Sequence, residues 1–278
     1  MKQVNIVAVS GGVDSVVLLD MLAKRADSVI VVAHFDHGIR SDSADDARFV
    51  AKLAEGYGFA FESRREELGA SASEELARNR RYGFLREIAA TYKGSITTAH
   101  HGDDAVETVA INFKRGTGWR GLAVLDSDIV RPLLDLSKQD ILAYAFQHHL
   151  VWHEDSTNAQ TVYLRNRIRR MTKDLPEDTK RQLLALRSQQ IGAKVLIDTH
   201  IFELIGDGPQ YSRYFFTHIP HGVAIECLRA VTKALLTRPQ LERVLLAIKT
   251  ASPKTQYQPG SGITIDFTTR NFSLSLLK

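Results

Sequence analysis

The sequence predicts an α/β fold with a doubly wound, mainly parallel sheet and a small C-terminal α+β appendage. Short apolar runs rich in β-branched residues begin at Val4 and Val29, and a weaker one begins at Ser95. Segments with helical periodicity separate these runs. Strands that alternate with helices are typical of βαβ units, in which helices cover both faces of a parallel sheet.

The elements of this sheet are expected in a regular order along the first part of the chain. The expected strands are 4–9, 29–33 and 95–98, and the expected helices are 13–23, 43–57, 71–92 and 103–114. Ser71, followed by Glu74, has the spacing of a capping box, which predicts that the third helix begins there. Ligands of such sheets bind at the carboxyl ends of the strands, so the residues that follow each strand are expected to carry the chemistry.

The organisation changes after residue 175, where a basic stretch ends at Pro176. A helical pattern with a weakening at Gly192 is followed by a loop signal at 206–209. The later elements are expected as helices at 179–205, 223–236 and 239–249 and as strands at 262–267 and 271–276. We therefore expect a catalytic domain over 1–175, a helical linker over 176–209 and a small domain over 210–278.

Composition limits the classes to which this chain can belong. It has 278 residues, of which 44% are hydrophobic and 24% charged, enough for one large domain and a smaller one. No apolar run reaches the roughly 18 residues that span a bilayer, and the N-terminus lacks the arrangement of a signal peptide. The single cysteine, Cys227, excludes an internal disulfide and a cysteine-based metal cluster within the chain. These features predict a cytoplasmic protein without a membrane partner.

The segment Ser10-Gly11-Gly12-Val13-Asp14-Ser15 follows the first strand and opens the first helix. Its glycines allow close approach of the backbone to phosphates, and a helix N-terminus attracts anions. It lacks the Gly-Lys-Ser/Thr of a Walker A loop, which argues against transfer of the terminal phosphoryl group. Asp14 would repel a phosphate unless it binds Mg²⁺ or orients the loop. A Gly/Ser turn without a ligand is the alternative.

This hexapeptide resembles the PP-loop of the ATP pyrophosphatases, which cleave ATP between the α- and β-phosphates. The resemblance implies an adenine nucleotide α-hydrolase-like sheet. Further segments, in order, resemble the tRNA(Ile)-lysidine synthetases. They are His34–Arg40, His100–Thr108, Arg115–Gly118 with Gly121-Leu122, Arg131–Leu134 with Lys138 and Tyr144, and Trp152, Asp155, Ser156, Asn158 and Tyr163–Arg169. The tail from 210 to 278 resembles the first C-terminal domain of that family only loosely, and we expect it to bind tRNA.

The resemblance implies a two-step reaction. ATP adenylates the C2 carbonyl oxygen of the wobble cytidine in isoleucine tRNA with a CAU anticodon, and pyrophosphate leaves. The ε-amine of free lysine then displaces AMP to form lysidine. The implied cofactors are ATP and Mg²⁺, and the implied partners are this tRNA and lysine. The oligomeric state stays open, a homodimer included.

The expected site residues follow from position and charge. The PP-loop residues Ser10, Gly11, Gly12, Val13, Asp14 and Ser15, together with His34, are expected to bind ATP, and Asp14 is the candidate Mg²⁺ ligand. Asp104 and Glu107 share a helix face at i and i+3 and suit a lysine ammonium or Mg²⁺, and we assign them to lysine binding. Asp36, just past a strand end, is the candidate general base or positions Mg²⁺. Arg115 and Arg131 are expected to stabilise phosphate charge.

Two basic clusters indicate RNA contacts. The segment Tyr163–Lys173 holds five basic residues and no acidic one, whereas a solvated helix face usually carries both signs. Arg165, Arg167, Arg169 and Arg170 are the expected RNA-binding residues there. Arg78 lies in a second cluster, for which pairing with neighbouring glutamates is an equal alternative. Zinc binding by His34 and His37 is a minor alternative to a hydrogen-bonding role.

Three other functions are compatible with a sheet of this kind. A tRNA thiolase needs cysteines for sulfur transfer or a cluster, and Cys227 alone does not supply them. An amidating ligase such as NAD or GMP synthetase would leave the basic run and the acidic pair unexplained. A non-catalytic RNA-binding protein on the same fold stays as the alternative from a different class.

Overall fold

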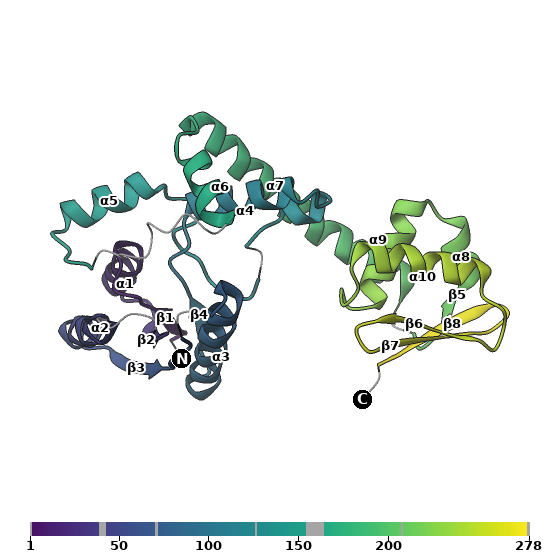
Figure 1. Cartoon of the computed structure of the whole chain (residues 1–278), viewed down its shortest axis with the longest axis horizontal. Coiled ribbons are helices and arrows are strands. Elements are labelled where there is room, and N and C mark those ends of the chain that lie inside the picture. Colours follow the sequence, from purple (N-terminus) through teal and green to yellow (C-terminus); the bar gives the residue numbers. More distant parts are fainter. Residues whose placement is uncertain are drawn as a thin grey trace. The chain divides into compact units, whose positions relative to one another are not determined.

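Four parallel strands form the first sheet, as the alternation of strands and helices predicts. The strands are β1 (Val4–Ala8), β2 (Val29–Asp36), β3 (Ala60–Arg65) and β4 (Ser95–Thr97). Their order is β3-β2-β1-β4, and every pair is parallel. This computed structural model describes residues 2–38, 43–69, 72–125, 127–153, 164–206 and 208–276. The chain divides into two units, Met1–Ile191 and Gly192–Lys278 (Figure 1).

Helices cover both faces of this sheet, which makes it doubly wound. They are α1 (Val13–Arg25), α2 (Ser43–Tyr57), α3 (Glu74–Tyr92), α4 (Gly102–Lys114) and α5 (Lys138–Gln147). On one face Leu18 and Ile141, from α1 and α5, pack with strand residues such as Val32. On the other face Leu85 of α3 packs with Ile6. Complete burial of one such side chain contributes about 1.5–3 kcal/mol, so both layers stabilise the sheet.

The third helix begins later than the expected capping box places it. It starts at Glu74, and its N-cap is Ser73, whose side chain accepts a hydrogen bond from the Leu76 N–H at 3.1 Å. Ser71 lies outside the described residues. The prediction of the start was wrong because two serines precede this helix, and the one adjacent to its first turn satisfies a free N–H.

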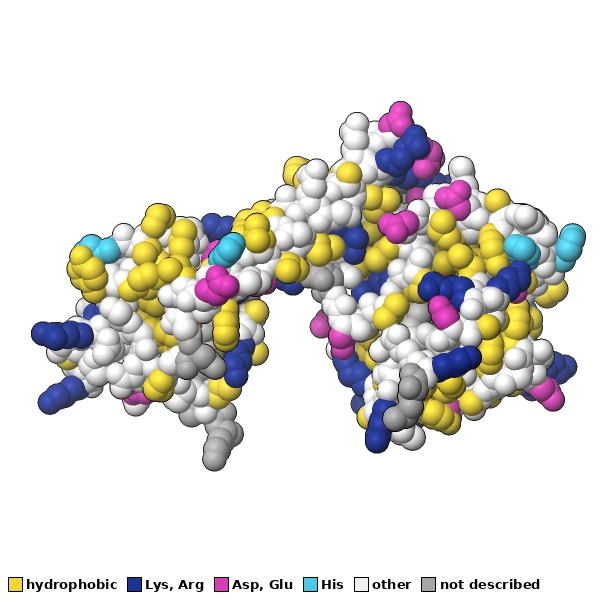
Figure 2. All heavy atoms as spheres, turned by 180° about the vertical axis from the view of Figure 1, so that it is seen from behind, with side chains coloured by type: hydrophobic (Ala, Val, Ile, Leu, Met, Phe, Trp, Pro, Cys, Tyr) yellow, Lys and Arg dark blue, Asp and Glu magenta, His cyan; other side chains and the backbone are white. Residues whose placement is uncertain are grey.

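A long helix follows residue 175 of the chain. The remaining helices of the first unit are the 3₁₀ turn η1 (Trp119–Leu122) and α6 (Leu164–Lys173), and α7 (Glu177–Ile205) continues past residue 191. The weakening expected at Gly192 does not interrupt α7, because a single glycine costs only about 1 kcal/mol within a helix. Beyond Gly192, α7 keeps apolar side chains exposed (Figure 2). Val195, Leu196, Phe202 and Leu204 are each more than half exposed.

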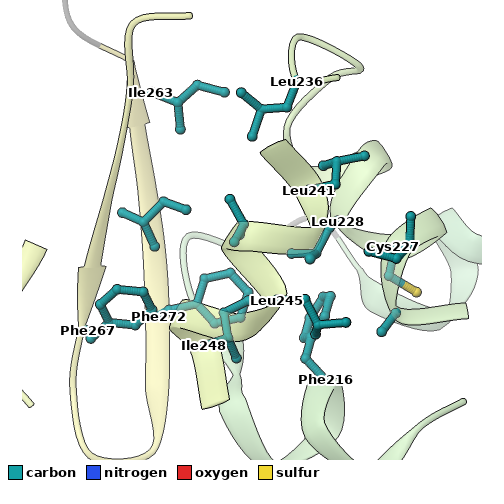
Figure 3. Packing of buried hydrophobic residues seen from close by; sticks show 14 of the residues in the cluster. Phe216, Cys227, Leu228, Leu236, Leu241, Leu245, Ile248, Ile263, Phe267 and Phe272 are labelled. Carbon is teal, nitrogen blue, oxygen red and sulfur yellow. The ribbon is translucent and has the colours of Figure 1, made fainter. Parts of the chain in front are cut away.

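The second unit contains the small α+β appendage that the sequence predicts. Its strands are β5 (Tyr211–Ser212), β6 (Gln256–Gly260), β7 (Ile263–Phe267) and β8 (Asn271–Leu276), and its helices are α8 (Arg213–His218), α9 (His221–Val231) and α10 (Arg238–Thr250). The antiparallel order is β5-β8-β7-β6. Leu228, Leu241 and Ile248 from the helices pack against Phe267 and Phe272 of the sheet (Figure 3).

Cys227 is part of this second core, where its side chain is completely buried. Burial raises the pKa of its thiol to about 11, so the thiol stays protonated at neutral pH. A protonated, inaccessible thiol is a packing group, which agrees with the exclusion of sulfur chemistry. Within the part of the chain that the structure describes, no helix combines the length and apolar character that a membrane span requires.

Candidate active site

The loop between β1 and α1 is held by hydrogen bonds among its own residues. The Ser15 hydroxyl donates to the Gly12 carbonyl at 2.8 Å and accepts from the Ser10 N–H at 3.2 Å. Gly12 is the N-cap of α1 and has no side chain to cover the helix end. The positive end of the α1 dipole is therefore open to an anion, as expected for this loop.

Gly11 has the backbone conformation that the loop requires, with φ of +95°. Its carbonyl accepts a hydrogen bond from the His153 N–H at 3.0 Å. The His153 ring stacks on Phe49 of α2, with ring centroids 4.3 Å apart, and its Nδ1 lies 2.7 Å from a carboxylate oxygen of Asp46. Residues outside the loop thus stabilise its backbone conformation at Gly11. The sequence of the loop itself did not indicate these contacts.

The acidic residue of the loop, Asp14, is paired with the ammonium group of Lys138 at the start of α5. The Nε2 of His101 lies 3.9 Å from the other Asp14 oxygen. These neighbours reduce the repulsion that a carboxylate would exert on a phosphate at the loop. The ion pair with Lys138 therefore explains how the loop can contain a carboxylate and still bind a phosphate.

Three carboxylates surround the His101 ring, which is almost completely buried. Besides Asp14, its ring nitrogens lie 3.7 Å from Asp103 and 3.5 Å from Asp104. The His101 N–H also donates to Asp104 at 3.0 Å, as the N-cap of α4. His101 thus connects the PP-loop acid to Asp104. The sequence indicates for His101 a hydrogen-bonding role more than a metal-binding one, as for His34 and His37, and its place before two aspartates was the signal for the role observed.

Asp104 and Glu107 lie on one face of α4, as their spacing predicts, and Glu107 is buried. Arg169 of α6 donates through Nε to Glu107 Oε1 at 2.7 Å, and its Nη2 lies 3.9 Å from Asp104 Oδ1. Burial lowers the pKa of Arg169, but the bond to Glu107 outweighs this and raises it above its usual value. An arginine expected to face RNA therefore points at the two acids.

Lys180 of α7 and the start of α5 fix the remaining acid, Asp103. Lys180 Nζ lies 3.0 Å from Asp103, and the Lys138 N–H donates to it at 2.7 Å. Burial acts to raise the pKa of Asp103, and these two bonds lower it below its usual value. Asp103 is thus a structural link between α4, α5 and α7, in agreement with its position at a helix N-terminus.

Asp36 and His34 lie at the carboxyl end of β2, both buried. Asp36 accepts from the Gly38 N–H at 2.8 Å and from Arg65 Nη1 at 3.2 Å. The Nδ1 of His34 donates to the Val9 carbonyl at 2.8 Å, because a carbonyl can only accept. The other ring nitrogen, Nε2, is buried without a hydrogen-bond partner among the described residues.

Within the described part of the chain, the other histidines are not arranged with these residues as a metal site. Burial lowers the pKa of His37. Burial also lowers the pKa of His100 to about 4, so His100 is neutral at physiological pH and hydrogen-bonds Thr98 at 2.8 Å. Among the described residues, no group of three or more histidine, cysteine or acidic side chains is arranged to hold a metal ion.

Arg131 and Arg115 occupy different environments. Arg131 Nη1 donates to the carbonyls of Leu125 and Ile129 at 2.8 and 3.1 Å and to Ser127 Oγ at 3.1 Å. Burial lowers its pKa. These bonds fix the loop that precedes Arg131 to its guanidinium group. Arg115 is the exposed C-cap of α4. Neither position tests the phosphate contacts expected of them.

The basic residues expected to contact RNA separate into two kinds. Arg167 and Arg170 of α6 are exposed, and the side chain of Arg165 lies outside what the structure describes, as do Arg40, Asp155, Ser156, Asn158 and Tyr163. Arg78 lies over the ring of Tyr82, with its guanidinium carbon 4.8 Å from the ring centroid. Glu87 pairs with Arg64 at 2.7 Å. The stacked Arg78 keeps a guanidinium close to the protein surface, and its RNA contact stays a prediction.

Comparisons with known proteins agree with this arrangement. Residues 1–175 match the family model described as the PP-loop domain. The chain is 39% identical to the tRNA(Ile)-lysidine synthase of Geobacter sulfurreducens, over 59% of this chain and 38% of that protein. It is 33% identical to the Thermus thermophilus enzyme of that name, and the match covers 92% of this chain and 54% of that enzyme. For the Chlorobaculum tepidum enzyme of the same name the identity is 35%, and the match covers 73% of this chain and 67% of that enzyme. The chain thus spans about half or less of the first two relatives.

A solved structure shows the same fold at lower identity. The U34-tRNA thiolase of Methanococcus maripaludis, determined with its [4Fe-4S] cluster, superposes with a TM-score of 0.59 and 18% identity. The match covers 69% of this chain and 73% of the thiolase. At this identity the likeness concerns the fold alone. It confirms the adenine nucleotide α-hydrolase-like sheet that the loop sequence predicted.

Proposed function

The chain belongs to the tRNA(Ile)-lysidine synthetase family of PP-loop proteins, and we propose that it uses ATP to ligate lysine to C2 of the wobble cytidine of CAU-anticodon isoleucine tRNA. The observation that carries this proposal is that one histidine ring lies beside two groups of acids. His101 lies between Asp14 of the PP-loop and Asp104 beside Glu107. A site for ATP and a site for a cation therefore adjoin, as a two-step ligation requires.

The first step needs ATP held with its α-phosphate exposed to the base. The α1 N-terminus and the backbone at Gly11 and Gly12 form the proposed phosphate cradle. The buried Nε2 of His34 can accept a hydrogen bond from an amine or hydroxyl of the nucleoside. The cytidine C2 oxygen then attacks the α-phosphorus, and the bond to pyrophosphate breaks.

Magnesium fits one residue of this site. Mg²⁺ needs one or two carboxylates and completes its shell with phosphates and water. Asp14, one-third exposed at the loop, is the carboxylate that would hold it together with ATP. The ion would supply positive charge to the departing pyrophosphate. Lys138, paired with the same carboxylate, is a second positive group at this position.

The second step joins lysine to the activated base. Asp104 and Glu107 bind the ammonium end of lysine, which must lose one proton before its nitrogen attacks C2. The bond between C2 and the AMP oxygen breaks as the new C–N bond forms. Asp36 is the proposed acceptor of the amine proton, because it ends β2 beside the loop-bearing strand β1. Arg115 and Arg131 keep their proposed role towards phosphate charge.

The tRNA is proposed to contact α6 through its exposed arginines, Arg167 and Arg170, and the second unit of the chain. Arg78 and Arg165 are the further proposed contacts. Because tRNA and ATP are the substrates, the reaction belongs in the cytoplasm.

The test is incorporation of labelled lysine into CAU-anticodon isoleucine tRNA in the presence of ATP and Mg²⁺. We expect one lysine per tRNA, with AMP and pyrophosphate as products, and none in the same tRNA with uridine at the wobble position. AMP formation without lysine transfer would indicate another PP-loop enzyme. Absence of both would indicate a non-catalytic RNA-binding protein.

Two variants separate the roles of the acids. Asp14→Ala should abolish AMP formation. Glu107→Gln should leave adenylation of the tRNA in place and raise the KM for lysine. Glu55→Gln, on the exposed side of α2, is the matched control and should change neither activity. Equal loss of adenylation in the Asp14 and Glu107 variants would contradict this separation.

A further inference from the structure

Helix α6 presents two different faces to its surroundings. Ile168 and Thr172 are buried, and α6 packs against α4. On the opposite face Arg167, Arg170 and Lys173 are exposed. Arg169 lies between these faces and reaches towards the acids of α4. One helix thus carries an inward-pointing arginine and outward-pointing basic residues that are available to RNA phosphates.

The inward-pointing guanidinium makes the contacts that a lysine ammonium would make. Glu107 is 4% exposed, and Arg169 Nε donates to its Oε1 at 2.7 Å. A buried carboxylate requires a cation or several hydrogen-bond donors, because its desolvation is otherwise unfavourable. Guanidinium and ammonium are both cations that donate N–H bonds to carboxylates. Two of them at the same oxygens would repel each other.

We infer that Arg169 occupies the lysine-ammonium subsite in the RNA-free chain, and that RNA phosphates on α6 draw it out, so that RNA binding opens the site for lysine. This inference rests on the proposed function, because it takes Asp104 and Glu107 as the lysine-binding acids. It adds an order of binding: RNA first, lysine second. It also gives Arg169 a role as a gating residue in addition to its expected contact with RNA.

The geometry allows this exchange without unfolding. The Arg169 side chain is 42% exposed, so its guanidinium can turn from Glu107 towards solvent. Phosphates bind guanidinium strongly and in a fork-like manner. Arg170 is its sequence neighbour on the exposed face and would bring a phosphate close. The cation lost from Glu107 is then replaced by the ammonium group of the entering lysine.

The expected size of the effect follows from populations. If Arg169 occupies the subsite for about 90–99% of the time, the apparent affinity for lysine is about 10- to 100-fold below that of the open site. RNA that moves the Arg169 side chain out of the subsite raises the apparent affinity for lysine by the same factor. By linkage, lysine must strengthen RNA binding by the same factor.

The test is equilibrium dialysis with labelled lysine, with and without a CAU-anticodon stem-loop RNA. For the unaltered chain we expect the RNA to tighten lysine binding at least about 10-fold. Arg169→Ala should bind lysine at least about 10-fold more tightly than the unaltered chain without RNA, and RNA should add less than about 2-fold. Arg181→Ala removes an arginine on α7 whose partner, Asp178, is also exposed, and it should behave as the unaltered chain.

The outcomes distinguish the inference from the function on which it rests. Equal lysine affinity with and without RNA in the unaltered chain would overturn the inference even if Arg169→Ala does not fold. Weaker lysine binding by Arg169→Ala would also overturn it, since Arg169 would then help to hold lysine. If lysine does not bind under any condition while ATP is still cleaved, the proposed function fails, and the inference fails with it.

Discussion

Lys138 and Asp14, which are 124 positions apart in the sequence, form an ion pair that joins the start of α5 to the first turn of α1. A lysine at a helix N-terminus is disfavoured by the dipole, and a carboxylate beside a phosphate site repels the ligand. Each residue removes the disadvantage of the other. The pair therefore has a consequence for nucleotide binding as well as for the packing of α1 and α5.

Replacement of Lys138 by methionine should raise the KM for ATP in AMP formation on the order of 10-fold. The substitution leaves the Asp14 charge beside the phosphates without its nearest cation. Steady-state kinetics with varied ATP and saturating tRNA measure this change. Lys52→Met, on the exposed side of α2, is the control and should leave the KM unchanged. An unchanged KM in the Lys138 variant would show that Asp14 does not face the bound phosphates.

Gly11→Ala should lower the free energy of unfolding by about 1–2 kcal/mol, because φ at this position is +95° and an L-residue is strained there. Space is not the cause, since an added Cβ would lie 3.5 Å from Phe49, an ordinary contact. Urea unfolding followed by tryptophan fluorescence measures the loss. Trp119 and Trp152 are the two tryptophans of the chain, and both belong to the first unit.

Gly56→Ala is the matched control for that measurement. Gly56 lies within α2, and nothing lies within 4 Å of an added Cβ. Alanine there should raise the free energy of unfolding by about 0.5–1 kcal/mol, because alanine has the higher helix propensity. A loss of the same size in both variants would mean that the backbone at Gly11 is not strained by a side chain.

The central strands could be predicted because their signal is local. Residues of β1 and β2 are apolar and β-branched on both faces, as buried parallel strands are. The edge strand β3 was missed, since its sequence Ala-Phe-Glu-Ser-Arg-Arg carries charges that an edge position tolerates. The start of α3 was predicted at Ser71, but the second of two nearby serines, Ser73, is its N-cap.

The candidate site was predictable only where neighbours in space are neighbours in sequence. The PP-loop and the shared face of Asp104 and Glu107 follow from spacing within one element. The contact of Arg169 with Glu107 joins residues 62 positions apart, and the basic run around Arg169 indicated only the sign of its charge. Which arginine of such a run turns inward depends on how α6 packs on α4.

Tyr57→Phe should lower the free energy of unfolding of the first unit by about 1.5–3 kcal/mol, as expected for a hydrogen bond to a buried charge. The Tyr57 hydroxyl donates to Asp20 at 2.7 Å, and Tyr144 donates to the same carboxylate at 2.8 Å. Urea unfolding by tryptophan fluorescence again measures the loss. Tyr92→Phe removes a bond to the less buried Glu62 and should cost less.

The loss in Tyr57→Phe should also depend on pH. Burial acts to raise the pKa of Asp20, and the bonds from Lys24, Tyr57 and Tyr144 lower it below its usual value. A carboxylate with a depressed pKa contributes stability above its unfolded pKa of about 4, and this is lost as the pH falls through its folded pKa. The difference between the variant and the unaltered chain should therefore be largest near pH 7 and shrink below about pH 4. A difference that grows on acidification would contradict this assignment.

Arg213→Lys should destabilise the second unit by about 1–3 kcal/mol, because lysine keeps the charge but loses the fork. The Arg213 guanidinium donates to the carbonyls of Ile248, Ala251 and Thr268 at 2.8, 2.7 and 2.9 Å, which ties the end of α10 to the turn after β7. Hydrogen exchange of the β7 and β8 amides should accelerate, while the amides of β1 and β2 keep their rates. Arg243→Lys, on the exposed side of α10, controls for the substitution itself. Faster exchange in both sheets would mean that Arg213 acts on the whole chain, and unchanged exchange in β7 would mean that its three carbonyl bonds contribute nothing.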